Sequence, residues 1–303
     1  MALEDVTKTD LYKKIVDRRS FMTGIGVAGI GAAAVGLAGC SSTAMKAMAQ
    51  TTGSADTAQN IFTAALIAED LATTMYYNAL VGGVIQDPNL AGSGGTATSI
   101  TAGGSVANVG YLRGALSEEI SHATVLRGAL SISASTGDPV QTFYFPTGTF
   151  DNLTNFFPVL IALETAFIAA YMTAVQEFSL MIGGVAPYSS SQMSASGTAY
   201  TSTQLASFAK LSAAILGVEA EHRTLARAIP NPPTFDNVTI LPSDNVCYES
   251  TDGLQTVYTG MSSAAAALKP FLSNGSGTTP YQLQTALSGA ANVQLVCSGM
   301  PPM

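Results

Sequence analysis

Four long stretches of the chain carry apolar residues at the spacing of an α-helix. They cover residues 57–85, about 105–130, 151–182 and about 202–229. In the first stretch, Ile61, Ala65, Ala68 and Ala72 recur every three or four positions, which places them on one helix face. Parts of the first and third stretches are apolar almost without interruption, as in helices that are buried on most sides. The pattern predicts an all-α domain of four helices.

Segments rich in glycine, serine and threonine separate the four stretches. Residues 91–105, AGSGGTATSITAGGS, hold too many of these residues to lie inside a helix or strand. A loop at residues 137–150 is expected to hold a short strand, and a serine-rich loop precedes the fourth helix. That helix ends at IPNPP, residues 229–233, because proline lacks the backbone N–H that continues a helix. We therefore assign residues 57–229 to the helical domain.

Residues 230–303 differ in character, and we expect them to form a C-terminal extension packed on the helical domain. They begin with β-branched, turn-rich sequence and continue with one more helical pattern at about 253–269. Their two cysteines, Cys247 and Cys297, are expected to form a disulfide in an oxidising compartment. Such a bond would close a loop of about 50 residues and stabilise the fold by about 4 kcal/mol on the chain-entropy model.

Residues 1–39 are predicted to be an export signal, and residues 40–56 a linker. Arg18 and Arg19 precede a weakly apolar run of glycine and alanine that ends in small residues. A basic start, a short apolar segment and a small-residue end are typical of a cleavable signal. The sequence RRSFM resembles the twin-arginine export signal, which carries folded proteins across the membrane.

Two cleavage sites are open for this signal. The sequence LAGC, residues 37–40, resembles a lipobox, which implies lipidation of Cys40 and a periplasmic or cell-envelope lipoprotein attached to the membrane. A cut after Ala49, in the sequence AMAQ, would instead release a soluble secreted protein. We favour the lipobox.

The chain downstream of the signal is acidic. From residue 50 onward it holds six Lys and Arg against 16 Asp and Glu, which gives a formal net charge of −10. Proteins that bind nucleic acid through its phosphates carry clustered cations. We therefore expect no nucleic-acid partner.

The two histidines of the chain occur in the same local pattern. His122 follows Glu119 by three positions, and His222 follows Glu219 by three positions. Residues three apart lie on one face of a helix, so each glutamate and its histidine can reach a common point. The second and fourth helices thus present one Glu-x-x-His motif each.

The first and third helices each carry a glutamate within apolar sequence, and these are Glu69 and Glu164. A buried carboxylate is costly unless it is paired or bound to a metal. In a four-helix bundle, one carboxylate from each of two helices and a Glu-x-x-His from each of the other two converge on a dinuclear site. Carboxylate oxygens with imidazole suit iron or manganese. The predicted metal ligands are Glu69, Glu119, His122, Glu164, Glu219 and His222.

This set of six residues, with the doublet Glu118-Glu119, resembles the ferritin-like di-iron carboxylate superfamily over about residues 57–229. The twin-arginine signal makes the chain similar to exported bacterial ferritin-like domain proteins, related to desiccation-related proteins. The resemblance implies an all-α, ferritin-like four-helix bundle with a C-terminal extension, holding two iron ions or, alternatively, manganese. It implies that Glu119 and Glu219 lie between the metals, that Glu69 and Glu164 are terminal ligands, and that each metal has one histidine.

Other polar residues of the helices are expected to support the predicted ligands or to lie outside the predicted site. Tyr76 and Tyr171 each follow a predicted ligand glutamate by seven positions. They are expected either to hydrogen-bond ligand carboxylates across the domain or to be ordinary core tyrosines. Three further glutamates, Glu118, Glu177 and Glu221, are expected on a solvated helix face. Arg127 and Arg227 are expected on the surface or in ion pairs.

The resemblance implies redox chemistry with dioxygen or peroxide, such as ferroxidase activity or peroxide removal. A dimanganese catalase-like protein uses similar ligands and is the nearest enzymatic rival. The alternative from another class is a non-catalytic extracytoplasmic stress or desiccation protein, in which the metal is structural or the site is vestigial.

Overall fold

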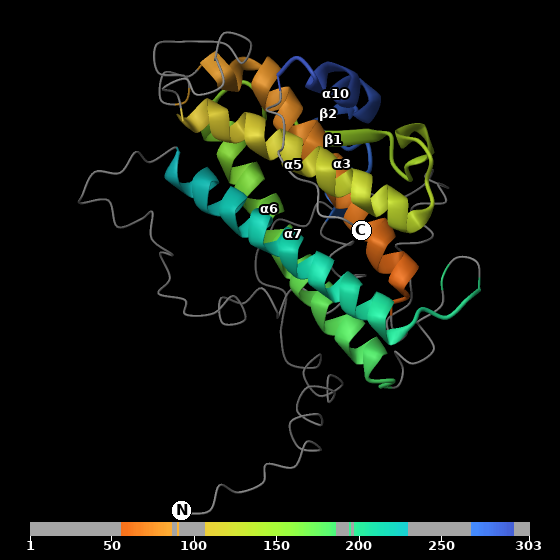
Figure 1. Cartoon of the computed structure of the whole chain (residues 1–303). Coiled ribbons are helices and arrows are strands. Elements are labelled where there is room, and N and C mark those ends of the chain that lie inside the picture. Colours follow the sequence, from red (N-terminus) through yellow and green to blue (C-terminus); the bar gives the residue numbers. More distant parts are fainter. Residues whose placement is uncertain are drawn as a thin grey trace, which may run out of the picture. The chain divides into compact units, whose positions relative to one another are not determined.

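A computed structural model describes residues 56–86, 90, 107–185, 194, 197–229 and 268–293. This part of the chain is mainly helical (Figure 1), which confirms the all-α expectation. Its α-helices are α3 (Ala58–Val81), α5 (Ala107–Leu130), α6 (Leu153–Ile182), α7 (Ser202–Ala228) and α10 (Leu283–Ala290). Short 3-10 turns occur at η1 (Gly83–Gln86), η3 (Ser135–Gly137) and η7 (Lys269–Phe271). The predicted export signal, Cys40, Cys247 and Cys297 lie outside the described residues.

Side chains just before the helices satisfy their first backbone N–H groups. Thr57 accepts a hydrogen bond from the backbone N–H of Asn60 at the start of α3. At the start of α7, Thr201 accepts from the backbone N–H of Gln204, whose side chain accepts in return from the backbone N–H of Thr201. Such caps fix where a helix begins.

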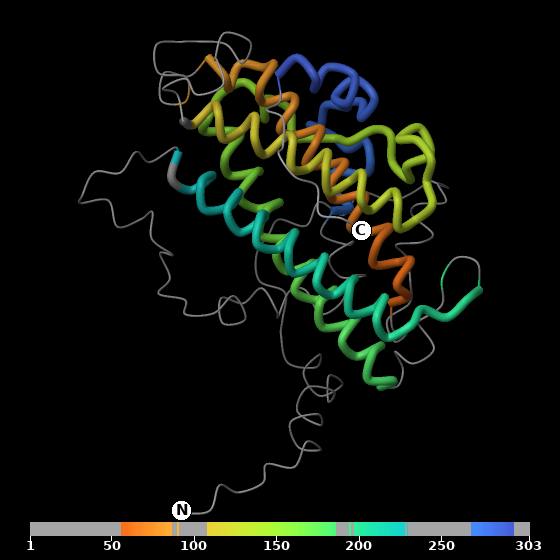
Figure 2. The backbone as a smooth tube through the Cα atoms, viewed as in Figure 1, coloured from red at the N-terminus to blue at the C-terminus, as the bar shows by residue number. Residues whose placement is uncertain are grey.

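The four long helices pack in two pairs. α3 lies along α5, and α6 lies along α7, and the pairs meet where α3 contacts α6 and α5 contacts α7. Figure 2 shows the α6–α7 pair as two adjacent tubes. α6 is long and apolar enough to cross a membrane by length and composition, but most of its most apolar stretch is buried inside the protein. α6 is therefore a core helix of the described part of the chain.

The apolar core consists of two clusters that follow one another along the helices. In α3, Ala58 to Leu66 contribute to one cluster, and Ile67 to Leu80 contribute to the other. In α5 the division falls between Leu116 and Ala123, which is the segment that carries Glu119 and His122. The Glu-x-x-His motifs of α5 and α7 thus lie in a polar layer between the two clusters. Glu69 and Glu164 reach this layer from helix segments whose neighbouring residues belong to one of the clusters.

A small sheet attaches part of the C-terminal extension to the helices. β1 (Thr142–Pro146) pairs with β2 (Thr278–Gln282) in antiparallel fashion, with Phe143 opposite Tyr281. β1 confirms the strand that was expected in the loop at residues 137–150. After β2 the chain continues into α10, which packs on α3.

Candidate metal centre

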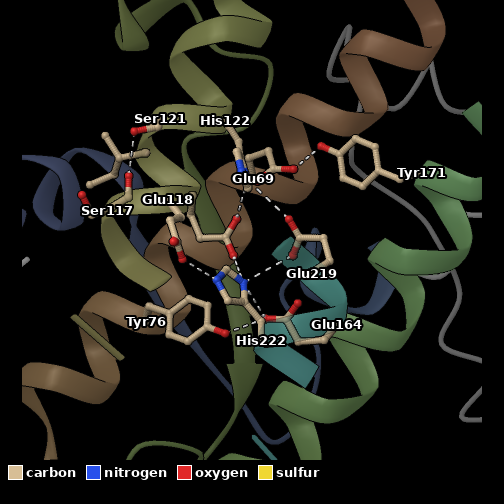
Figure 3. A network of polar contacts seen from close by, with 12 residues as sticks. Glu69, Tyr76, Ser117, Glu118, Ser121, His122, Glu164, Tyr171, Glu219 and His222 are labelled. Atoms are coloured by element: carbon tan, nitrogen blue, oxygen red, sulfur yellow. Dashed lines mark hydrogen bonds and ion pairs between the residues drawn. The ribbon is translucent and has the colours of Figure 1, made fainter. Parts of the chain in front are cut away.

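The four long helices bring all six predicted ligands to the polar layer (Figure 3). α3 supplies Glu69 and α6 supplies Glu164, while α5 and α7 each supply one Glu-x-x-His pair. All six side chains are buried or nearly so, and the most exposed is His122, at 12%. A buried cluster of carboxylates and imidazoles that could hold a metal ion is therefore present.

The six side chains form two overlapping groups. In each group, one ligand atom from every residue lies within 4.8 Å of the ligand atoms of the others. The first group is Glu69, Glu119, His122 and Glu219, and the second is Glu119, Glu164, Glu219 and His222. The groups share two glutamates, and each adds one glutamate and one histidine of its own.

His222 faces the carboxylates with its Nδ1 atom. This nitrogen lies 3.0 Å from Glu119 Oε1 and 3.8 Å from Glu164 Oε1. It also lies 3.6 Å from Glu219 Oε2, yet it forms no hydrogen bond with any of the three. The other ring nitrogen, Nε2, lies 2.9 Å from Glu118 Oε2. A cation between Nδ1 and the carboxylates of Glu119, Glu164 and Glu219 would serve as a partner for the nitrogen and for the three carboxylates together.

His122 also directs Nδ1 at the cluster, but in a different way. It forms a hydrogen bond with Glu69 Oε2 at 3.1 Å. Its Nδ1 lies farther from the shared residues, at 3.4 Å from Glu219 Oε1 and 3.7 Å from Glu119 Oε2. The two histidines therefore approach the shared glutamates from two sides.

Several buried atoms of the cluster have no hydrogen-bond partner. These atoms are both carboxylate oxygens of Glu119 and of Glu219, Oε2 of Glu164 and Nδ1 of His222. A buried polar atom left unpaired costs about 1–3 kcal/mol. Metal coordination would satisfy these atoms, and carboxylate oxygen with imidazole nitrogen is the donor set that iron and manganese accept. The residues present therefore fit a metal site.

Two tyrosines hold the outer carboxylates across the interface between the helix pairs. The hydroxyl of Tyr76, on α3, donates to Glu164 Oε1 of α6 at 2.6 Å. Reciprocally, the hydroxyl of Tyr171, on α6, donates to Glu69 Oε1 of α3. The second oxygen of Glu69 contacts His122, and the second oxygen of Glu164 is buried without a hydrogen-bond partner. Of the two roles open from the sequence, the structure shows the hydrogen-bonding one.

The burial and crowding of the cluster shift the pKa values of its members in opposite directions. Burial raises the pKa of Glu69 and of Glu164 well above the usual carboxyl value, and neighbouring carboxylates raise it further. Burial also acts to raise the pKa of Glu119, but contacts with Glu69 and with both histidines outweigh burial and lower this pKa. The pKa of Glu219 is lowered by its contacts with the two histidines, again against burial.

Both histidines have raised pKa values. Burial alone would lower the pKa of an imidazole, but the surrounding glutamates raise it well above the usual value for His122 and for His222. Without metal, the raised pKa values favour the protonated forms of both histidines, of Glu69 and of Glu164. The two shared glutamates remain ionised.

The structure corrects one of the solvated-face expectations, for Glu177, and adds a contact to another, for Glu118. Glu177 was expected on a solvated face but is buried, so that prediction is wrong. Glu118 is 42% exposed, yet it pairs with His222 across the α5–α7 interface, which no local spacing indicates. Glu221 is exposed as expected, and Arg227 is half-buried.

A buried ion triad next to the cluster was missed in the sequence. Arg127 is ion-paired, one of the two roles expected for it. It binds Asp70 Oδ1 through Nη2 at 2.7 Å and Asp138 Oδ2 through Nε at 2.8 Å. Asp70 directly follows Glu69 in the same apolar stretch, so the reasoning that selected Glu69 applied to it equally. The triad joins α3 and α5 to the loop before β1.

Comparison of the chain with protein-family models, with curated proteins and with solved structures finds no match.

Proposed function

We propose that the protein is an exported, ferritin-like four-helix bundle formed by α3, α5, α6 and α7, whose six buried glutamates and histidines bind two iron ions or, alternatively, two manganese ions. The observation that carries the proposal is the overlap of the two ligand groups. Each group has a glutamate and a histidine of its own, and both use Glu119 and Glu219. Two shared carboxylates between two otherwise separate ligand sets are the arrangement of a dinuclear site.

The charges of the cluster suit two divalent cations. Four ionised glutamates balance two charges of +2, and neutral imidazoles complete the ligand set. Glu119 and Glu219 would lie between the ions, with Glu69 and His122 on one side and Glu164 and His222 on the other. Tyr76 and Tyr171 orient the two outer carboxylates.

Bound iron or manganese would supply one-electron steps between the +2 and +3 states, which permit reduction of dioxygen or peroxide. The chain contributes a largely buried site next to two apolar clusters, in which the ligands are held in place. We therefore propose redox chemistry of the ferroxidase or peroxide-removal type.

Elemental analysis of protein purified from its native compartment tests the metal part of the proposal. We expect two equivalents of iron or manganese per chain, and loss of metal in Glu119→Ala. Glu221→Ala is the matched control, because Glu221 is an exposed glutamate beside His222.

Oxidation of added ferrous ions by dioxygen, and disappearance of peroxide with or without oxygen evolution, test the reaction. Oxygen evolution by a manganese-loaded protein would identify catalase-like chemistry. A metal-loaded protein with no turnover in either assay would contradict the redox proposal and leave a structural metal site.

A further inference from the structure

We propose that the two halves of the cluster are unequal: the Glu164–His222 half is the high-affinity metal position that fills first, the Glu69–His122 half is the exchangeable position, and Glu118 sets the difference. This inference rests on the proposed two-metal site. The two ligand sets are alike in composition, but the residues around them differ.

His222 is already held in the orientation in which its Nδ1 atom can bind a metal. Its Nε2 atom is held by Glu118 Oε2 at 2.9 Å, so its Nδ1 atom is fixed toward the cluster. Nδ1 has no hydrogen bond that must be broken. A carboxylate on the far nitrogen of a ligating histidine fixes its orientation and raises its basicity as a ligand. Both effects favour binding at this half.

His122 has neither advantage. Its Nδ1 is engaged in a hydrogen bond with Glu69 Oε2, which must break before both atoms can bind a metal. The position that corresponds to Glu118, one hundred residues on, is Val218, whose side chain accepts no hydrogen bond. Within the described residues, the carboxylates near His122 are all members of the cluster. We therefore expect the Glu69–His122 half to bind a metal more weakly than the Glu164–His222 half.

A second hydrogen bond holds His222 and, in the described part of the chain, has no counterpart at His122. The hydroxyl of Tyr111, on α5, donates to the backbone carbonyl of His222 at 2.7 Å, and the two rings lie 6.0 Å apart. The residue that corresponds to Tyr111 is Leu211, which cannot make this hydrogen bond. Two differences in the repeat, Glu118 against Val218 and Tyr111 against Leu211, thus favour the same half.

The exposed fractions of the two histidines agree with the proposed order of filling. The side chain of His222 is 1% exposed, whereas that of His122 is 12% exposed. Solvent reaches the cluster more easily beside His122, so an ion at that half exchanges more readily. Glu118 covers the other half and is a positioning residue, because it acts through His222 rather than on the metal.

Anaerobic titration of the metal-free full chain with Mn²⁺ tests the inference, with binding followed by calorimetry and by electron paramagnetic resonance. We expect two separate steps in the wild type, with the spectrum of an isolated ion after one equivalent and of a coupled pair after two. Glu118→Gln should weaken the first step about 10- to 100-fold and affect the second step less. Glu221→Gln removes the same charge beside His222 and should leave both steps unchanged.

His122→Ala provides the second test and should remove the second step while the first remains. Thermal melts of the metal-free variants check that each is folded. If two ions bind in one step, or if Glu118→Gln behaves like Glu221→Gln, the inference fails while the two-metal site stands. If fewer than two ions bind to the wild type, the proposed function fails and the inference fails with it.

Discussion

Tyr76 and Tyr171 are the residues that tie the two helix pairs together at the cluster. Each donates a hydrogen bond to the outer glutamate of the opposite pair. Both carboxylates are fully buried, so no water can replace a lost tyrosine hydroxyl at that position. The tyrosines therefore support both the packing and the orientation of the proposed ligands.

Replacing either tyrosine by phenylalanine should destabilise the metal-free protein by about 1–3 kcal/mol, because a buried carboxyl oxygen loses its partner. The same change should also weaken metal binding. Urea denaturation with and without metal measures both effects. Tyr144→Phe, on a half-buried tyrosine of β1, is the control and should change neither quantity. Equal stability of Tyr171→Phe and the control would contradict the role assigned to the hydroxyl.

The protons of the metal-free cluster predict a pH dependence of metal binding. The pKa values of Glu69, Glu164, His122 and His222 are all raised, which favours the protonated forms of these groups in the metal-free protein. Metal binding requires neutral imidazoles and ionised carboxylates, so uptake of two ions should release protons and tighten as pH rises. Calorimetry in buffers of different ionisation enthalpy counts the protons. A release of none would contradict a buried, protonated cluster.

The raised pKa values of the cluster also make the stability of the metal-free protein depend on pH. A group whose pKa is raised in the folded state contributes stability below its unfolded pKa and loses it as pH rises through the folded pKa. The free energy of unfolding without metal should therefore fall as pH rises, above the ordinary carboxyl pKa for Glu69 and Glu164 and above the ordinary imidazole pKa for the two histidines. The metal-loaded protein should not show this loss, because its ligands are already deprotonated.

At the scale of the elements, the docking of α10 on α3 depends on a glycine. A Cβ atom at Gly289 would lie 2.2 Å from the hydroxyl oxygen of Tyr77 and 2.5 Å from two of its ring carbons. Gly114, in α5, has nothing within 4 Å of the corresponding position. The same substitution should therefore have opposite effects in these two helices.

Gly289→Ala should destabilise the protein by about 1–3 kcal/mol, because the added methyl group collides with a packed ring. Gly114→Ala should stabilise it by up to about 1 kcal/mol, because alanine is the better helix former and meets no neighbour. Denaturant midpoints of the two variants provide the comparison. A stabilising Gly289→Ala would contradict the packing of α10 against Tyr77.

Helical periodicity and the two Glu-x-x-His motifs were enough to place the four long helices and the six clustered side chains. Both signals are local, since they relate residues three to seven positions apart. The pairing of β1 with β2 joins residues such as Phe143 and Tyr281, which no local pattern connects. The contact between Glu118 and His222 is hidden for the same reason, because it forms only when α5 and α7 pack.

At the scale of the whole molecule, the proposed export signal and the proposed metal site support each other. Twin-arginine export of a folded protein would allow metal to be acquired in the cytoplasm. Replacing Arg18 and Arg19 together by lysine should retain the precursor inside the cell, as fractionation and immunoblotting would show. Cys40→Ala should abolish labelling with a radioactive fatty acid. Normal processing of Cys40→Ala after Ala49 would contradict the lipoprotein proposal and leave a soluble exported protein.

The most direct test of the central claim is a crystal structure of the full chain, purified with its native metal, with diffraction data collected at the iron and manganese absorption edges. We predict two anomalous peaks within the cluster, one beside Glu69 and His122 and one beside Glu164 and His222, with Glu119 and Glu219 between them. A single peak, no peak, or peaks away from these six residues would contradict the dinuclear metal site.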